Sequence, residues 1–174
     1  MLSTLVFGGV TAGEILKPRQ ERQGNMKVNT KVRYGLRAIL QIAESYGGDP
    51  VPISVISDTQ EISGKYLEQV VGTLRKAELI NSRKGVRGGY TLCRDPKEIN
   101  LWEIITALDN HTTLVDCVLE PDVCDRSDDC LTRSIWTLLS ARMKEFWSSF
   151  TLADLIRTMN ENDNSALEQL VEGD

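Results

Sequence analysis

The sequence predicts a mainly α-helical protein with one small β-hairpin and a long helix near its C-terminus. Apolar residues recur at helical spacing through most of residues 30–159. Residues 79–93, around a glycine-rich turn, have instead the pattern of two paired strands. The helical pattern after Cys130 carries more large apolar side chains than a small domain can cover. We therefore expect one domain with an extended helix for association.

Composition and charge limit the possible functions. The chain has 174 residues, 41% of them apolar, and no run approaches the ~20 apolar residues of a membrane span. Residues 1–13 lack the basic start of a secretory signal, so we expect a cytoplasmic protein with reduced thiols and no membrane partner. The net charge is −5, yet residues 26–100 carry 12 Lys+Arg against 8 Asp+Glu, and residues 101–174 carry 5 against 15. The basic part can face a polyanion.

The first helix follows a stretch without periodicity. Residues 1–25 are expected to be a disordered N-terminal extension. Asn29 or Thr30 then serves as N-cap, and Gly47 with Gly48 stops the helix. One stripe of the helix is apolar and should pack in the core: Val32, Leu36, Ile39, Leu40 and Ala43.

A short helix, a tight turn and a second helix come next. Ser54 is expected to cap the short helix, and residues 60–62 turn the chain into the next cap, Ser63. The second helix has a predicted buried stripe of Leu67, Val70, Val71 and Leu74. Its opposite stripe is polar: Lys65, Glu68, Gln69, Gly72, Arg75 and Lys76. This order is the helix-turn-helix pattern, whose second helix enters the major groove of DNA.

Residues 79–83 and 90–93 are predicted strands joined by a basic, glycine-rich tip. The tip contains Lys84, Arg87, Gly88 and Gly89. Glycines let a backbone approach a phosphate or a groove closely, and an arginine suits minor-groove contact. A hairpin tip alone is equally well explained as a solvated turn. Directly after a helix-turn-helix it indicates a wing, so residues 26–100 form a predicted winged helix-turn-helix DNA-binding domain.

A capped helix follows the wing. Asn100 and Glu103 match a capping box, and Ile99 can pack on Ile104 across this cap. The helix is expected to run to Asn110. It leads from the wing to a loop rich in cysteine and acidic residues.

The last two predicted helices lie beyond Cys130. The long one has an apolar stripe that a second copy of the chain would cover: Ile135, Leu138, Leu139, Met143, Phe146, Trp147 and Phe150. Thr151 and Asp154 cap the final helix. Residues 101–159 would thus hold the loop and the dimerisation helices, and residues 160–174 a flexible acidic tail.

The acidic loop carries Cys117, Cys124 and Cys130, separated by six and five residues. Thiolates are soft ligands for iron-sulfur clusters, zinc or copper(I), and loops of this length can wrap a polynuclear cluster. Zinc fits less well, because structural zinc sites usually have closely spaced cysteine pairs and the chain has one histidine, His111. Ordinary thiols, or a disulfide between two of them, also remain open. Cys93 is expected to be a small apolar side chain in the core.

These motifs together resemble the Rrf2 family of bacterial transcription regulators, most closely its iron-sulfur branch, the IscR type. The matching segments are Met26 with Lys27, residues 34–38, 66–69, 74–76 and 88–90, the three cysteines, residues 130–132 and residues 151–152. The resemblance spans residues 26–158.

The resemblance implies a homodimer with crossed long helices on a palindromic operator in double-stranded DNA. Implied contacts in the grooves or to phosphates are Ser63, Lys65, Tyr66, Glu68, Gln69, Arg75, Lys84, Arg87, Gly88 and Gly89. Glu68 can accept from a cytosine amino group and repel phosphate, although a solvated helix face explains it equally well. The implied function is a repressor controlled by an iron-sulfur cluster on Cys117, Cys124 and Cys130, with 2Fe-2S favoured over 4Fe-4S.

The chain departs from the IscR pattern at the fourth cluster ligand. That pattern has a histidine three residues after the last cysteine, where this chain has Arg133, and a guanidinium cannot be a ligand. A related branch borrows a carboxylate from the partner's first helix, but Arg33 stands at that place. The spacing between Cys117 and Cys124 is also one residue longer than in the IscR pattern. Candidates for the fourth ligand are Asp125, Asp128, Asp129, His111, and an external thiol or water.

Two other functions fit parts of the sequence. A winged-helix regulator without a cluster could use the cysteines as a thiol-disulfide switch. An electron-transfer module or enzyme is disfavoured, because no phosphate cradle, nucleotide fingerprint or acid-base pair is found and the basic winged helix would be left unexplained. We therefore expect no enzymatic activity.

Overall fold

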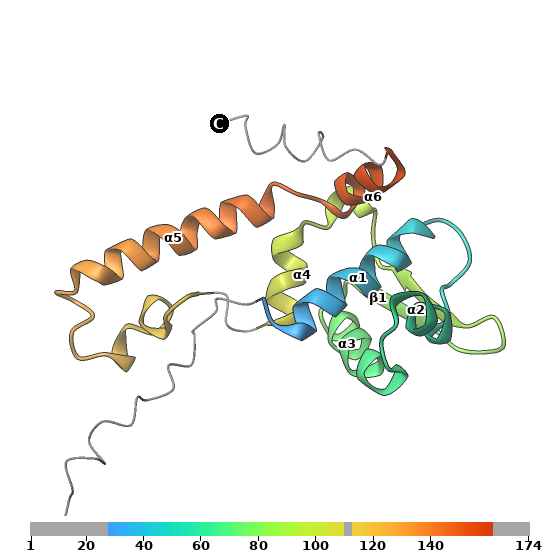
Figure 1. Ribbon diagram of the computed structural model, residues 1–174, viewed down its shortest axis with the longest axis horizontal. Helices are drawn as coiled ribbons and strands as arrows, with labels where there is room; N and C mark the ends of the chain where they lie inside the picture. Colours follow the sequence, from blue (N-terminus) through green and yellow to red (C-terminus); the bar gives the residue numbers. More distant parts are fainter. Residues whose placement is uncertain (1–27, 110–112, 162–174) are drawn as a thin grey trace, which may run out of the picture.

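The computed structural model describes residues 28–109 and 113–161. Its elements, in chain order, are α1 (Thr30–Glu44), α2 (Ile53–Gln60), α3 (Gly64–Lys76), β1 (Ile80–Arg83), β2 (Gly89–Leu92), η1 (Pro96–Glu98), α4 (Leu101–Leu108), η2 (Asp116–Val118), η3 (Pro121–Val123), α5 (Leu131–Ser148) and α6 (Leu152–Glu161). In Figure 1, α1 to α4, the hairpin and α6 form a head, and α5 projects from it with residues 113–130 at its far end. The predicted fold class, mainly α with a small β-wing, is confirmed.

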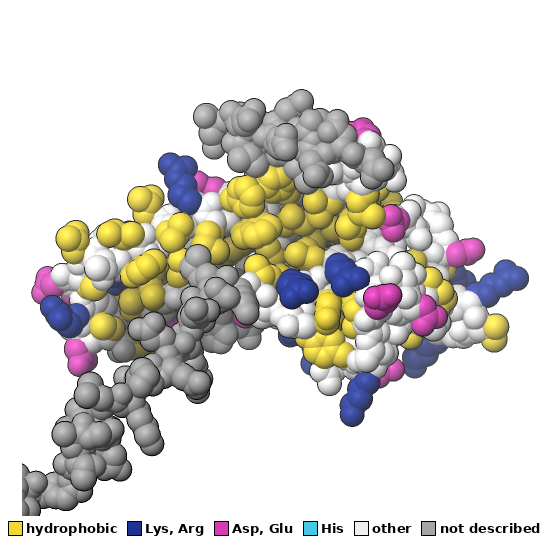
Figure 2. Space-filling model, viewed as in Figure 1, with side chains coloured by type: hydrophobic (Ala, Val, Ile, Leu, Met, Phe, Trp, Pro, Cys, Tyr) yellow, Lys and Arg dark blue, Asp and Glu magenta, His cyan; other side chains and the backbone are white. Residues whose placement is uncertain are grey.

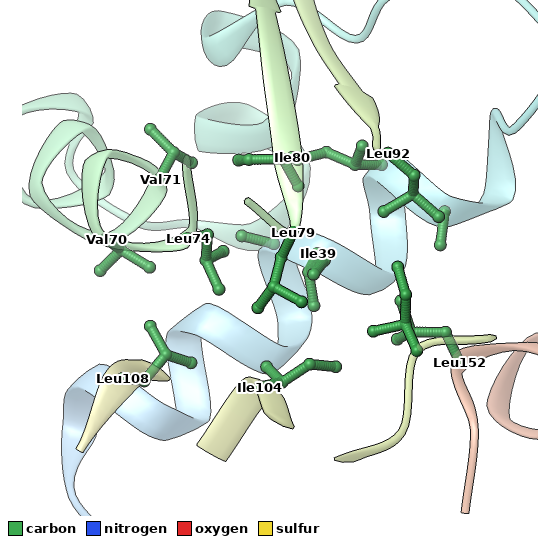
Figure 3. Close-up of a cluster of buried hydrophobic side chains, with 14 of the residues drawn as sticks. Ile39, Val70, Val71, Leu74, Leu79, Ile80, Leu92, Ile104, Leu108 and Leu152 are labelled. Carbon is green, nitrogen blue, oxygen red and sulfur yellow. The ribbon is translucent and has the colours of Figure 1, made fainter. Parts of the chain in front are cut away.

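Helix α1 lies at the centre of the head. Asn29 caps it as predicted, because its side chain accepts a hydrogen bond from the Val32 backbone N–H at 2.8 Å. The inner face is fully buried at Ala38 and Ile39. Figure 3 shows Ile39 among buried side chains from α3, the hairpin, α4 and α6, including Val70, Val71, Leu74, Leu79, Ile80, Leu92, Ile104, Leu108 and Leu152. One core therefore supports all of these elements.

The helix-turn-helix is formed by α2 and α3. The expected cap at Ser54 was wrong: Pro52 is the N-cap residue of α2, and Ser54 lies inside the helix. The fixed φ of proline lets the chain enter the helix directly at Ile53. Ser63 does stand at the N-cap position of α3, but its side chain makes no capping hydrogen bond. The predicted buried stripe of α3 is confirmed at Leu67, Val70, Val71 and Leu74.

Side-chain hydrogen bonds tie the end of α2 to α1. Arg37 donates to the Gln60 side-chain oxygen at 2.8 Å and to the Gln60 carbonyl at 2.7 Å. Gln60 in turn donates to the Gln41 side chain at 2.9 Å. Since Gln60 is the last residue of α2, this network fixes the turn that leads into α3.

The wing is an antiparallel hairpin in which Ile80 of β1 lies opposite Leu92 of β2. Val51 adds an isolated bridge, because Val51 and Tyr90 exchange two backbone hydrogen bonds of 2.9 Å. Gly89 permits this approach, since a Cβ at Gly89 would stand 2.4 Å from the Val51 carbonyl oxygen. The base of the wing is thus held on the head and only its tip is free.

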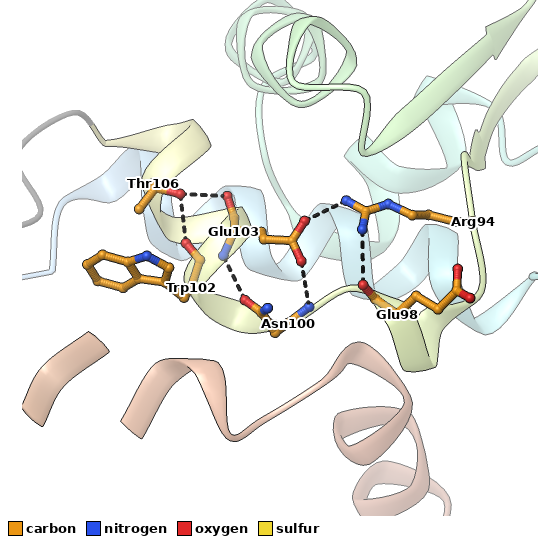
Figure 4. Close-up of polar contacts among 6 residues, drawn as sticks. All are labelled: Arg94, Glu98, Asn100, Trp102, Glu103 and Thr106. Carbon is orange, nitrogen blue, oxygen red and sulfur yellow. Dashed lines mark hydrogen bonds and ion pairs between the residues drawn. The ribbon is translucent and has the colours of Figure 1, made fainter. Parts of the chain in front are cut away.

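A polar cluster joins the wing to α4 (Figure 4). The predicted capping box is confirmed: the Glu103 N–H donates to the Asn100 side chain at 3.0 Å, and the Glu103 carboxylate accepts from the Asn100 N–H at 3.5 Å. Arg94 forms an ion pair with the same carboxylate and donates to the Glu98 carbonyl at 3.1 Å. These contacts fix the direction of the helix that leads to the cysteines.

The two C-terminal helices differ in burial. Ser140 is the one buried residue of α5, whereas Phe150, in the linker to α6, is buried in the head. Thr151 and Asp154 form the predicted reciprocal cap: the Asp154 N–H donates to Thr151 Oγ1 at 3.2 Å, and the Thr151 N–H donates to Asp154 Oδ2 at 3.0 Å. Helix α6 continues to Glu161, into the segment expected to be tail. The expected extension at residues 1–25 and the rest of the tail lie outside the described residues.

Two further expectations need correction. Cys93 was expected in the core but is exposed. The strand ends at buried Leu92, and because successive side chains of an extended chain point to opposite faces, Cys93 points outward. Helix α4 ends at Leu108 and not at Asn110. Within the described residues, none of the helices has the length and apolar content needed to cross a membrane.

The end of α3 provides a test of backbone strain. Glu78 has a φ of 57°, and the N–H groups of Glu78 and Leu79 donate to the carbonyls of Arg75 and Leu74, both at 3.1 Å. This pattern is a Schellman motif, whose left-handed residue is usually glycine. We predict that Glu78→Gly raises the free energy of unfolding by roughly 0.5–1 kcal/mol in urea denaturation. Gln69→Gly, at an exposed position in the middle of α3, should lower it by about 1 kcal/mol, and a destabilised Glu78→Gly would contradict this explanation.

Candidate functional site

The polar face of α3 is exposed, opposite the buried stripe that holds the helix on the head. Five of the predicted contact residues lie on this surface: Ser63, Lys65, Glu68, Gln69 and Arg75. The Arg75 guanidinium donates to the Ser82 hydroxyl of β1 at 3.3 Å. This bond links the end of α3 to the wing, so the helix and the hairpin form one surface.

Tyr66 differs from the other predicted contact residues because it is half-buried. Its ring meets the Tyr34 ring edge to face, with 5.9 Å between centroids. The guanidinium carbons of Arg33 and Arg37 lie 5.9 and 5.8 Å from the centroid of the Tyr34 ring. The fold thus brings two arginines of α1 beside the first turn of α3. This contribution could not be predicted from the sequence, because no local pattern connects the two helices.

The wing tip presents two of the predicted basic residues. Lys84 and Arg87 are exposed on either side of Val86, and Gly85 has a φ of 114°. The fold of the hairpin by itself favours glycine at position 88, since a Cβ on Gly88 would stand 2.4 Å from the Arg83 carbonyl oxygen. Contact of Gly88 and Gly89 with DNA stays a prediction.

The cysteine loop, residues 113–130, lies between α4 and α5 in the chain and contains η2 and η3. Cys117 lies in η2, Cys124 follows η3, and Cys130 is the N-cap residue of α5. All three are half-buried free thiols. Among the described residues, no three His, Cys, Asp or Glu side chains come close enough to hold a metal ion. The loop places its thiols on one end of the molecule, and their sulfurs do not converge in this structure.

Arg133, at the place where the IscR pattern has its histidine, is engaged in hydrogen bonds. Its Nε donates to the Cys117 carbonyl at 2.9 Å and its Nη1 donates to the Ser127 carbonyl at 3.3 Å. The three carboxylates considered as fourth ligand, Asp125, Asp128 and Asp129, are exposed. His111 lies outside the described residues.

The pKa values of the Cys130 and Cys93 thiols are shifted in opposite directions. The Thr132 hydroxyl, whose oxygen lies 3.1 Å from the Cys130 sulfur, lowers the pKa of Cys130, with help from the Arg133 backbone N–H. Partial desolvation of the sulfur raises the pKa of Cys93, and the charge of Glu78 acts in the same direction. Cys130 therefore has more thiolate, the form that binds metal or reacts, than Cys93 at a given pH. The role of Thr132 was not predicted from the sequence.

The donor set fits an iron-sulfur cluster at three positions. Three partly accessible thiols in one loop supply the soft ligands that such clusters require. The fourth protein position does not fit, because a guanidinium has no acceptor atom for a metal and that of Arg133 already donates to two carbonyls. A fourth ligand would have to come from another residue or from outside the chain.

A helical head with one buried core, a helix α3 whose polar face is exposed, and a basic wing define a winged-helix DNA-binding regulator. The chain belongs to the Rrf2 family: the family model, described as an iron-dependent transcriptional regulator, matches residues 28–158. The matched relatives are transcription regulators and not enzymes.

Individual relatives support the predicted resemblance. The chain is 38% identical over 154 residues to the HTH-type transcriptional regulator IscR of Sodalis glossinidius. The matched region covers 85% of this chain and 93% of that protein. The structure of T. potens IscR matches with a TM-score of 0.65 and 33% identity over 79% of this chain and 91% of that one. The oxidized form of Staphylococcus aureus CymR matches with a TM-score of 0.60 and 30% identity over 75% and 96% of the two chains.

The opposite pKa shifts predict different thiol reactivities. In reduced, metal-free protein at about pH 7.5, Cys130 should react several-fold faster with iodoacetamide than Cys93, because a larger fraction of it is thiolate. Thr132→Val should lower the alkylation rate of Cys130 and leave that of Cys93 unchanged, as measured by mass spectrometry of quenched samples. Thr137→Val, on the same helix, is the matched control. Equal rates for Cys130 in the wild type and in Thr132→Val would disprove the role of the hydroxyl.

Proposed function

We propose that the chain is a transcriptional repressor whose operator binding is controlled by an iron-sulfur cluster held by Cys117, Cys124 and Cys130. The position of these thiols carries the proposal. They lie in the segment between α4, which packs in the DNA-binding head, and α5, whose apolar side chains are exposed. A change at the thiols can therefore alter how the head is held relative to α5.

The proposed DNA contacts follow from the exposed surface of the head. Helix α3 enters the major groove with Lys65 near a phosphate and Gln69 near base edges. Glu68 accepts from a cytosine amino group and disfavours other bases, which makes it a determinant of operator choice. Lys84 and Arg87 contact the minor groove or its phosphates from the wing.

The proposed partner of α5 is a second copy of the chain. Figure 2 shows hydrophobic side chains gathered along α5 and across the neighbouring part of the head. The exposed set includes Leu131, Ile135, Trp136, Leu138, Leu139 and Phe146, with Leu131 80% and Leu138 62% exposed. An apolar helix face of this extent is typical of a protein interface. Two crossed α5 helices would place two heads on the two halves of a palindromic site.

The proposed cofactor acts at the start of α5. When bound, an iron-sulfur cluster, 2Fe-2S by resemblance to the IscR type, would supply a redox-sensitive cross-link between the three cysteines. Cys130 is the N-cap residue of α5, so a change in the order of the cysteine loop can extend to the first turn of the dimerisation helix. The spacing of two heads in a dimer depends on this helix.

Anaerobic reconstitution combined with DNA binding tests the proposal. The protein is loaded with iron and sulfide, followed by visible absorption, and titrated by fluorescence anisotropy against double-stranded DNA selected from a random library. We expect apo and loaded protein to differ at least about tenfold in operator affinity, and binding to weaken by roughly three decades between about 50 and about 200 mM salt. Absence of iron uptake, or equal binding by the two forms, would falsify cluster control.

Single cysteine variants provide matched controls for this experiment. Cys124→Ser should lose the cluster absorption, because it removes one of the three proposed ligands. Cys93→Ser should keep it, because Cys93 is exposed on the head, after β2 and outside the cysteine loop. Absorption that persists in Cys124→Ser would indicate adventitious iron, and loss of absorption in Cys93→Ser would show that the three loop cysteines do not hold the cluster by themselves.

A thiol-disulfide switch is the second candidate. The free, partly accessible state of the three loop thiols favours it, as does the similarity to a CymR structure described as an oxidized form. Mass spectrometry of oxidised protein would then find a disulfide between two of the loop cysteines, and DNA binding would change without iron.

The dimer is tested by one substitution on α5. Leu138→Glu should shift the protein from dimer toward monomer in sedimentation equilibrium, because a charge would be buried in the interface, with a loss of at least about tenfold in dimer affinity. Leu138 is 62% exposed in one chain, so the fold of the monomer should be unaffected. Lys144→Gln, an equal change of charge at an exposed position of the same helix, should remain dimeric. A wild-type protein that sediments as a monomer would disprove the proposed dimer.

A further inference from the structure

We propose that Arg133 is a positioning residue that gathers the three cysteine-bearing segments at the start of α5, in the metal-free protein as well. The guanidinium donates to two carbonyls that are distant along the loop, from Nε to Cys117 at 2.9 Å and from Nη1 to Ser127 at 3.3 Å. Arg133 is half-buried, and Ser127 is the buried residue of the loop. The side chain that replaces the histidine of the IscR pattern thus acts on the backbone of the loop.

Hydrogen bonds from this arginine reach the neighbourhood of all three cysteines. Cys117 accepts directly from the guanidinium. Cys124 is reached in two steps, because the Ser127 N–H donates to the Cys124 carbonyl at 3.0 Å and the Ser127 carbonyl accepts from Arg133. Cys130 accepts at its carbonyl from the Arg133 backbone N–H at 3.0 Å. One residue therefore connects η2, the turn after η3 and the first turn of α5.

The chemistry of the guanidinium suits this role. Its planar fork carries several N–H donors, so it can bond two carbonyls at once, which a lysine ammonium does with less geometric definition. A guanidinium is a charged donor, and hydrogen bonds from a charged donor are stronger than neutral ones. It has no acceptor atom for a metal, so its contact with the loop does not compete with metal binding as that of a histidine would.

The role of Arg133 deepens the proposed function. Only its effect on DNA binding rests on that function, because the contacts of Arg133 are present without it. If the cysteine loop controls DNA binding, Arg133 separates two tasks that one ligand residue would combine. The arginine keeps the backbone of the loop near α5, and the fourth ligand of a cluster is left to an exchangeable group. The start of the dimerisation helix then stays attached to the loop when metal is lost.

Hydrogen exchange of the reduced, metal-free protein tests the role of Arg133 without cluster or DNA. In Arg133→Ala, amides of peptides within residues 113–134 should exchange at least about tenfold faster, because the bonds that close the loop are lost. Peptides from α1 and α3 should be unchanged, which also shows that the variant folds. Arg133→Lys should recover part of the protection, because one donor group remains. Arg126→Ala, an exposed arginine of the same loop, should exchange like the wild type.

A second measurement follows the thiols themselves. Alkylation of Cys117 and Cys124 should become several-fold faster in Arg133→Ala, since release of the loop exposes both residues. Exchange and alkylation rates within about twofold of the wild type would overturn the proposal. Because both readouts use metal-free protein, failure of cluster control leaves them unaffected, and an unchanged loop in Arg133→Ala leaves the cluster experiment unaffected.

Discussion

The burial of the inner face of α1 is the constraint on which the rest of the structure depends. Ala38 and Ile39 are fully buried, and α3, the hairpin, α4 and α6 all contribute side chains to the core around them. A fully buried isoleucine such as Ile39 contributes roughly 1.5–3 kcal/mol to the free energy of unfolding. Because the recognition helix, the wing and α4 share this support, the core sets the main features of their relative placement.

The cysteine loop and α5 are held by weaker and more local forces. Within the described part of α5, Ser140 is the one buried residue, and large apolar side chains such as Leu138 remain in solvent. The loop is closed by hydrogen bonds, with Arg133 at their centre. Segments of low local stability are the ones that respond to ligands and partners. The capping box at Asn100 keeps the beginning of α4 on the head, so such a response need not disturb the head.

Prediction from the sequence was accurate where one local pattern decides the outcome. The buried stripe of α3 and the capping boxes at Asn100 and Thr151 each depend on residues within about one turn of one another. Errors arose where a shift of one or two residues changes the environment. Ser54 lies inside α2 because the helix begins at Ile53, and Cys93 is exposed because β2 ends at Leu92. The packing of Tyr66 on Tyr34 was not predicted, because the two residues lie on different helices.

By itself, the sequence determined the order of helices, the wing, the spacing of the cysteines and the fact that no histidine ligand follows Cys130. These features are encoded by neighbouring residues, and they sufficed for a correct assignment to the family. The tertiary structure alone decided what Arg133 does instead. Its guanidinium meets the carbonyls of Cys117 and Ser127 because the loop folds back onto the start of α5, and backbone acceptors brought together in this way leave no mark on the side-chain sequence.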